Sequence, residues 1–257
     1  MNQFYNISPG YDLAQRLVKS VYGMAGYYDY AGPCYLGPVD RDYWATAATP
    51  HKWTLLHSAI FDFEKASIDQ ELDVLPLKEN VEFFSNYIKL SGVLPPNWLN
   101  EAEIDLHFDN FQQMLGTSIK ITAEAAFQLL FRDVEFLFEF QKLIRDTLKE
   151  SEHALGTEWL NNEGQFHRPN YLPRWLEKAI YHRDIGHCRS CGQDVSGEVF
   201  HYNQYHLDHM LPLSQGGCND PTNFQLLCKE CNLSKGGQLI QPTNRELRFW
   251  KAENTEP

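Results

Sequence analysis

Apolar residues recur three and four positions apart through most of the N-terminal part of the chain, which is helical spacing. Thr49 followed by Pro50 is typical of a helix start, because threonine caps free amides and proline is tolerated in the first turn. The longest periodic run is apolar around most of its girth, which predicts the central helix of a bundle. We expect helices over residues 8–22, 49–66, 77–90, 100–115 and 122–150, and an aromatic-packed loop over 23–48.

The C-terminal part has a different pattern, in which short segments replace the long helices. Residues 153–170 have the composition of a linker, and Pro173 starts a helix that leads into a first pair of cysteines. Residues 198–203 and 205–211 have strand-like composition, and a further helix is expected to start near Cys228. These short elements predict a small mixed fold after the helical part.

We therefore expect an α+β protein with a domain boundary near residue 165. Residues 1–165 would form a mostly α-helical domain, and residues 166–257 a small domain of strands and helix. The 257 residues are 43% apolar and 14% aromatic, which is ample for a core. No uncharged apolar run reaches about 18 residues, and the first residues lack the basic and apolar regions of a secretory signal. We expect a cytoplasmic protein without a membrane segment.

The charge of the chain is unevenly distributed. The formal net charge of −12 arises in residues 1–165, which hold 12 Lys or Arg and 24 Asp or Glu, whereas residues 166–257 hold 10 of each. An acidic surface repels phosphate and is a poor platform for nucleic acid. The N-terminal part is therefore not expected to bind DNA, and would either bind a protein partner or keep the C-terminal part away from unintended DNA.

Four of the six cysteines form two Cys-x-x-Cys pairs, Cys188 with Cys191 and Cys228 with Cys231. Each pair forms a tight turn that aims two thiolates at one point, and two such turns suit a tetrahedral zinc site. Four protein ligands leave no position for water, so this zinc is expected to be structural. The alternative is four thiols with coincidental spacing. Cys34 and Cys218 remain and are expected to be free thiols, Cys218 in a solvent-facing loop.

Residues 206–235 carry a second group of polar side chains. Asp208 and His209 are neighbours on an expected strand, Asn223 lies in a turn, and Asn232 directly follows the second cysteine pair. A neutral imidazole can accept a proton, and carboxylate and amide oxygens suit a hard divalent cation. Taken singly, these residues could be a turn-capping acid, a half-buried strand histidine and a helix cap. Together, beside a zinc site, they favour metal-assisted cleavage of a phosphodiester.

The order of these elements resembles the HNH, or ββα-metal, endonucleases, in their zinc-containing four-cysteine branch. The resemblance covers about residues 183–237 and consists of Cys-x-x-Cys, then Leu-Asp-His-Met-x-Pro-Leu, Gly-Gly-x-Asn-Asp and Leu-Leu-Cys-x-x-Cys-Asn-x-x-Lys. Residues 1–165 lie outside it. The resemblance implies that the C-terminal domain is a small ββα-metal nuclease domain with a structural zinc.

The resemblance also implies roles for the individual polar residues. His209 would be the general base, Asp208 and Asn232 would bind one catalytic Mg²⁺ or Mn²⁺, and Asn223 would orient the base. The third letter of the family name is often His and is Asn232 here, a variant of the pattern that weakens the case for zinc as the catalytic metal.

Two basic residues are further candidates for the site. Lys235 lies one turn after Asn232 on the same helix face, and Arg183 lies on the helix before the first cysteine pair. We expect both to contact phosphates of the substrate.

We expect, from all of these features, a metal-dependent endonuclease that hydrolyses DNA and carries a helical accessory domain. One form of this function is the effector subunit of a bacterial defence or restriction system, in which the acidic domain docks on a sensor or an ATPase. The alternative is a zinc-ribbon binding module with an inactive nuclease site, which acts through its helical domain as a protein-interaction subunit.

Overall fold

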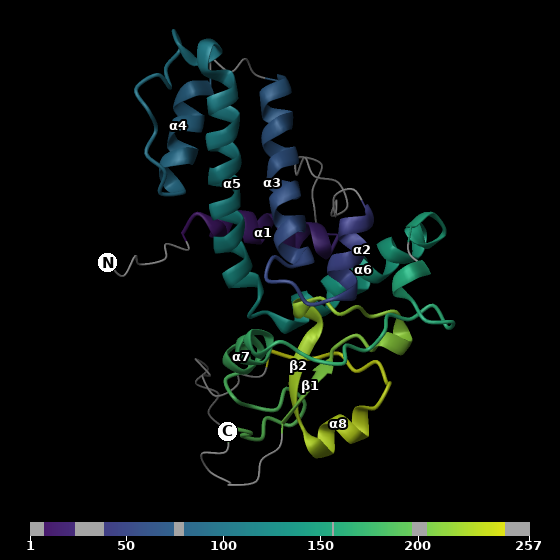
Figure 1. Cartoon of the computed structure of the whole chain (residues 1–257). Helices are drawn as coiled ribbons and strands as arrows, with labels where there is room; N and C mark the ends of the chain where they lie inside the picture. The colour runs from purple at the N-terminus through teal and green to yellow at the C-terminus, as the bar shows by residue number, and fades with distance from the viewer. Residues whose placement is uncertain (1–7, 24–38, 75–79, 156, 197–204, 245–257) are drawn as a thin grey trace, which may run out of the picture. The chain divides into compact units, whose positions relative to one another are not determined.

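A computed structural model of the chain describes residues 8–23, 39–74, 80–155, 157–196 and 205–244 (Figure 1). The chain divides into two compact units. The first unit comprises residues 1–38 and 55–130, and the second comprises residues 39–54 and 131–257. This division differs from the expected boundary near residue 165. The reason is that α6 (Val134–Leu155), the helix that follows residue 130, packs with the C-terminal part.

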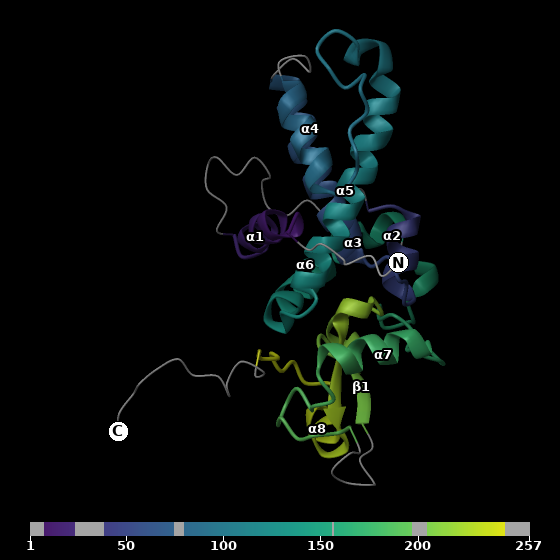
Figure 2. The same ribbon diagram turned by 90° about the vertical axis from the view of Figure 1, so that its left-hand side faces the viewer.

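The first unit consists of helices that pack around α5 (Phe108–Leu130), which contacts each of its helical neighbours. Its other elements are α1 (Gly10–Val21), α3 (Leu55–Val74), α4 (Val81–Leu90) and the short 3₁₀ helix η2 (Ile104–His107). Figures 1 and 2 both show α4 beside α5. At the start of α1, Gly10 lies so close to the backbone of Ala125 and Ala126 that any side chain would collide with α5.

The core of the first unit is aliphatic and aromatic, as the helical spacing predicts. One cluster of buried side chains joins α3, α4, η2 and α5: Ile68, Phe84, Ile88, Leu99, Ile104, Phe111, Leu115 and Ile119. Within the described ranges, no helix is both long and apolar enough to span a bilayer.

In the described part of the second unit, a two-stranded sheet packs with helices. Strand β1 (Tyr205–His209) pairs antiparallel with β2 (Phe224–Cys228), with His209 opposite Phe224. Helix α8 (Lys229–Lys235) follows β2 directly and contacts both strands, and α7 (Arg174–Arg183) contacts β2 (Figures 1 and 2). The remaining elements are α2 (Arg41–Ala48), α6 (Val134–Leu155) and the 3₁₀ turns η3 (Thr157–Trp159), η4 (Leu213–Gln215) and η5 (Pro221–Asn223).

Several helix boundaries differ from the expected ones, and capping explains two of the differences. Thr49 ends α2 instead of starting a helix, since its hydroxyl donates to the carbonyl of Ala45. The expected helix over 122–150 is two helices, because Asp133 accepts a hydrogen bond from the amide of Phe136 and starts α6.

Other expected elements have different bounds in the structure, or lie outside the residues that the structure describes. The expected helix over 100–115 starts later and extends further, as α5, and the expected loop over 23–48 includes α2. Strand β1 pairs with residues 224–228, which were not expected to form a strand. The expected strand over 198–203 and residues 24–38 lie outside the described residues.

Candidate active site and zinc site

The four paired cysteines lie together at one end of the small sheet. Their sulfur atoms all lie within 4.8 Å of one another, and the Sγ atoms of Cys191 and Cys228 are 3.9 Å apart. A tetrahedral zinc with bonds of about 2.3 Å separates its sulfur ligands by about 3.8 Å. The donor set and its spacing therefore fit one zinc ion, as the sequence predicts.

The two cysteine pairs are positioned by different elements. Cys188 and Cys191 lie in a turn after α7, closed by a hydrogen bond from Gly192 N to Cys188 O. Cys228 ends β2, and its Sγ accepts from the amide of Cys231 in the first turn of α8. A zinc here would join α7, β2 and α8.

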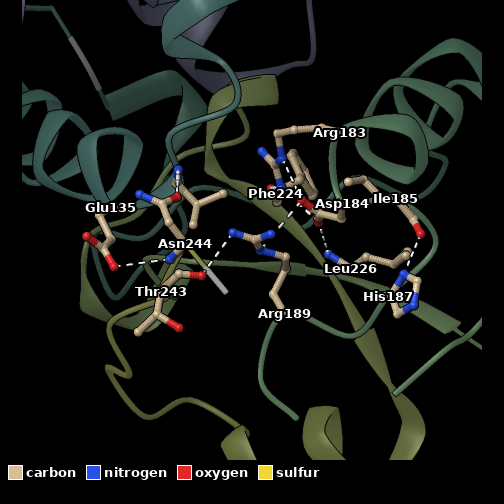
Figure 3. Close-up of polar contacts among 11 residues, drawn as sticks. Glu135, Arg183, Asp184, Ile185, His187, Arg189, Phe224, Leu226, Thr243 and Asn244 are labelled. Atoms are coloured by element: carbon tan, nitrogen blue, oxygen red, sulfur yellow. Dashed lines mark hydrogen bonds and ion pairs between the residues drawn. The ribbon is translucent and has the colours of Figure 1, made fainter. Parts of the chain in front are cut away.

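Arg183 is part of the interior that supports this turn (Figure 3). Its guanidinium donates to the carboxylate of Asp184 at 2.8 and 3.0 Å and to the carbonyl of Phe224 at 2.6 Å. Asp184 in turn accepts from the amide of Leu226, and Arg189 lies 3.8 Å away from it. We expected Arg183 to contact a substrate phosphate; instead its side chain is 1% exposed and braces α7 against β2.

Asp208 and His209 line one cleft of about 340 Å³ in the second unit. Neighbouring residues of a regular strand point to opposite faces, but these two lie at the end of β1, where the chain turns. The remaining lining residues are Asn161, Gln165, Phe166, His167, Arg168, Pro212, Leu213, Ser214, Gly236 and Gly237. The base and the carboxylate expected from the sequence thus share one cavity.

The imidazole of His209 is buried and held in a defined orientation. Its Nε2 lies 3.0 Å from Oδ1 of Asn219, and its ring packs against Phe224 at 4.4 Å between centroids. Burial lowers the pKa of His209 to about 4, against the hydrogen bond to Asn219 and the charge of Asp208, which raise it. The ring is therefore neutral near pH 7.

The partner of His209 determines which ring nitrogen carries the proton. The Nδ2 of Asn219 donates to the carbonyls of Ala48 at 2.8 Å and His167 at 2.9 Å. These two acceptors fix the amide orientation, so the oxygen of Asn219 faces His209 and can only accept. A neutral His209 consequently carries its proton on Nε2, and its Nδ1 keeps a free lone pair.

Asn223 shapes the loop that joins His209 to Asn219. It is fully buried, its Nδ2 donates to the carbonyls of Leu211 and Cys218 at 2.9 Å, and its Oδ1 accepts from the amide of Leu211. Gly217 lies against the same carbonyl of Leu211, where a Cβ would overlap it. Asn223 thus acts on the loop backbone, and the direct contact to the imidazole comes from Asn219.

The carboxylate of Asp208 is held from two sides. Lys235 Nζ lies 2.8 Å from its Oδ2, and Gln225 Nε2 donates to the same oxygen at 3.1 Å. Lys235 also donates to the carbonyl of His209 at 2.8 Å. We expected Lys235 to contact a substrate phosphate, but it is 4% exposed and joins α8 to β1.

Asn232 lies half-buried in α8, one helical turn before Lys235. Residues three apart share a helix face, so Asn232 lies on the side of α8 from which Lys235 reaches Asp208. It is not among the residues that line the cleft.

A zinc-type thiolate cluster, a neutral histidine and a carboxylate thus occur together within one short segment. Residues 188–238 match the HNH endonuclease family. No curated protein and no solved structure matches the chain. The match indicates nuclease activity in general and confirms the resemblance of the C-terminal part to the HNH endonucleases.

Two parts of the site were not anticipated from the sequence. Asn219 lies inside the HNH segment, between the double glycine and Asp220, and its place in the Gly-Gly-x-Asn-Asp motif was the available signal. The cleft wall formed by residues 161–168 lies outside the HNH segment, in a stretch expected to be a linker.

Cys218 is buried and donates to Gln141, contrary to the expected exposed thiol. Cys34 lies outside the described residues.

Proposed function

We propose that the chain is a metal-dependent endonuclease that hydrolyses phosphodiester bonds of DNA, with His209 as the general base. The observation that carries this proposal is the contact between His209 and Asn219 in a cleft that also contains Asp208. This contact holds the neutral imidazole in one tautomer and one orientation. Asp208 in the same cleft offers a carboxylate oxygen to a cation.

The protonation of His209 supports this role. A base that activates water needs a free lone pair directed at the substrate side. With the proton on Nε2, Nδ1 is the nitrogen that takes the proton from the attacking water. Asn219 holds the ring, and Asn223 holds the loop from which Asn219 extends.

Asp208 and Asn232 are the proposed ligands of one divalent cation, Mg²⁺ or Mn²⁺. Both contacts of Asp208 with Lys235 and Gln225 fall on Oδ2, so Oδ1 is the oxygen proposed for the cation. Carboxylate and amide oxygens suit hard cations and leave positions for water and phosphate. A bound cation would stabilise negative charge on the phosphate and on the leaving oxygen.

The zinc is proposed to be structural. Four thiolates complete its coordination, so no position remains for a reacting water. Its role would be to hold α8 against β1 and β2, which keeps Lys235 beside Asp208. Thiolates remain available to zinc in a reducing compartment, which agrees with the proposed cytoplasmic location.

The acidic N-terminal part is proposed to dock on a protein and not on DNA, as in an effector subunit of a bacterial defence or restriction system. In the first unit, a cleft of about 490 Å³ is lined by apolar Phe83 and Leu90, by Glu71, and by Arg16, which pairs with the lining residues Asp12 and Glu64. Phe83 and Leu90 are 53% and 65% exposed. The acidic excess of residues 1–165 repels phosphate, and exposed apolar side chains such as these suit a protein partner.

A plasmid-cleavage assay tests the nuclease proposal. Wild-type protein is compared with His209→Ala in Mg²⁺, in Mn²⁺ and in EDTA, after zinc content and circular dichroism show that both are folded. The expected result is nicking or linearisation by wild type in a divalent metal and none by the variant. His182→Ala is the matched control, because His182 is an exposed histidine of α7 outside the cleft.

Cleavage by pure, folded His209→Ala at the wild-type rate would remove His209 as the base. Absence of cleavage by wild type on supercoiled, relaxed and single-stranded DNA in every metal would favour the binding-module alternative.

A further inference from the structure

We propose that Arg168, which lies outside the HNH segment, binds a backbone phosphate of the nucleic acid next to the bond that is cleaved. The inference rests on the proposed function, since it assigns a substrate contact to the same cleft. Arg168 lines this cleft together with Asp208 and His209. The positive charge of Arg168 also lowers the pKa of the His209 imidazole.

The segment that carries Arg168 is a hydrogen-bonded turn that forms the wall of the cleft, and not a linker without structure. Leu160 and Phe166 pair as an isolated bridge, and the amide of Asn161 donates to the carbonyl of Gln165 at 2.8 Å. The side chain of Asn161 closes the turn by accepting from the amides of Glu163 and Gln165.

Two anchors attach this wall to the rest of the second unit. Phe166 is buried and lies 5.7 Å from the ring of Trp44. The carbonyl of His167 accepts from Asn219, the residue that orients His209. The backbone next to Arg168 is therefore connected to the proposed base through one side chain, that of Asn219. This connection fixes the position of the Arg168 backbone relative to His209.

The electrostatics of the cleft suit an anion. Among the described residues that line the cleft, Asp208 is the only acidic one, and Lys235 lies 2.8 Å from its carboxylate. Arg168 is exposed, and among the described residues no carboxylate pairs with it. Gly236 and Gly237 line the cleft without side chains, which lets a phosphate backbone come close. Guanidinium groups bind phosphate oxygens in a bidentate manner, so Arg168 is the group in this cleft best suited to a phosphate.

Binding and cleavage of a short labelled DNA duplex test the inference separately. Affinity is measured by fluorescence anisotropy in the non-cleaving His209→Ala background, with and without Arg168→Ala, over a range of salt concentrations. Loss of one charged hydrogen-bonded contact should weaken binding about 10- to 100-fold. The slope of log affinity against log salt should become shallower by about one.

Single-turnover cleavage is then compared for wild type, Arg168→Ala and Arg168→Lys. Lysine keeps the charge but not the bidentate geometry, so it should restore part of the rate. Arg132→Ala is the matched control, because Arg132 is exposed and lies outside the cleft.

The outcomes separate the two proposals. Wild-type binding and cleavage by Arg168→Ala would overturn the inference and leave the nuclease proposal intact. Wild type that neither binds nor cleaves the duplex would overturn both. Equal losses in Arg168→Ala and Arg132→Ala would also overturn the inference, because they would reflect general charge and not a contact in the cleft.

Discussion

Asn219 Oδ1 lies 3.0 Å from Nε2 of His209, and the other end of the same amide is bound to two backbone carbonyls. Because this arrangement selects one tautomer, Asn219→Ala should release the ring and allow both neutral tautomers. We expect the single-turnover cleavage rate to fall about 10- to 100-fold, the usual effect of losing a residue that orients a functional group. The ¹⁵N chemical shifts of the His209 ring should show protonated Nε2 in wild type and a mixture in the variant.

The nitrogen shifts separate positioning from a general loss of structure. Asn219 also satisfies the carbonyls of Ala48 and His167, so its removal lowers stability as well. A folded Asn219→Ala protein with a slow rate and the wild-type tautomer would contradict the positioning role.

Removal of the Lys235 ammonium should destabilise the second unit. The side chains of Lys235 and Asp208 are 5% and 11% exposed, so Lys235→Met leaves a largely buried carboxylate without its cation and the carbonyl of His209 without its donor. The expected loss in the free energy of unfolding is about 3 kcal/mol, measured by urea denaturation. The exposed Lys229 of the same helix supplies the control, Lys229→Met, which should change stability little.

If Lys235 instead served mainly as a phosphate contact, Lys235→Met would weaken DNA binding and leave the unfolding midpoint unchanged. That result would restore the role expected from the sequence.

Zinc should bind in a ratio of one per chain and should be required for the fold of the C-terminal segment. Cys231→Ser removes one of four thiolates, so the purified variant should contain little zinc by mass spectrometry and should lose protection of the β1 and β2 amides in hydrogen exchange. Cys218→Ala is the control, because Cys218 is buried outside the thiolate cluster. Equal zinc contents in the two variants would be inconsistent with the proposed site.

Local sequence patterns predicted the family resemblance and the cysteine cluster of the C-terminal part. The cysteine spacing predicted a thiolate cluster, and Cys188, Cys191, Cys228 and Cys231 converge as expected, because two tight turns leave few other arrangements. Asp208 and His209, which are adjacent in the sequence, line the same cleft.

Contacts between distant segments were not predictable in the same way. The orientation of the Asn219 amide, which contacts His209, depends on the carbonyls of Ala48 and His167. Both residues lie far from Asn219 in the sequence. Arg183 and Lys235 carry the charge of a phosphate contact, and only tertiary burial distinguishes them from the exposed Arg168. Residue type alone therefore suggested Arg183 and Lys235 as phosphate contacts, and the buried positions of both argue against that role.

The pH dependence of stability should have a component from His57 in the first unit. His57 is 7% exposed and stacks on Phe127 at 3.7 Å between ring centroids, and burial lowers its pKa to about 4. In the unfolded chain the pKa is about 6.5, so below that pH the unfolded state binds a proton that the folded state does not, and stability falls as the pH drops toward 4. The contribution is nearly constant above about pH 7.5, and about 1 kcal/mol of it should be lost by about pH 5.5.

Urea unfolding of wild type and His57→Gln at about pH 7.5 and pH 5.5 measures this component, since glutamine cannot take up the proton. The difference in stability between the two pH values should be smaller in the variant by about 1 kcal/mol. The ring resonances of His57 in wild type should not titrate until the pH approaches 5, which follows directly from the buried, uncharged ring. A titration midpoint near the ordinary value, or identical pH dependence in both proteins, would mean that the ring takes up its proton in the folded state and that its burial against Phe127 does not oppose the charge.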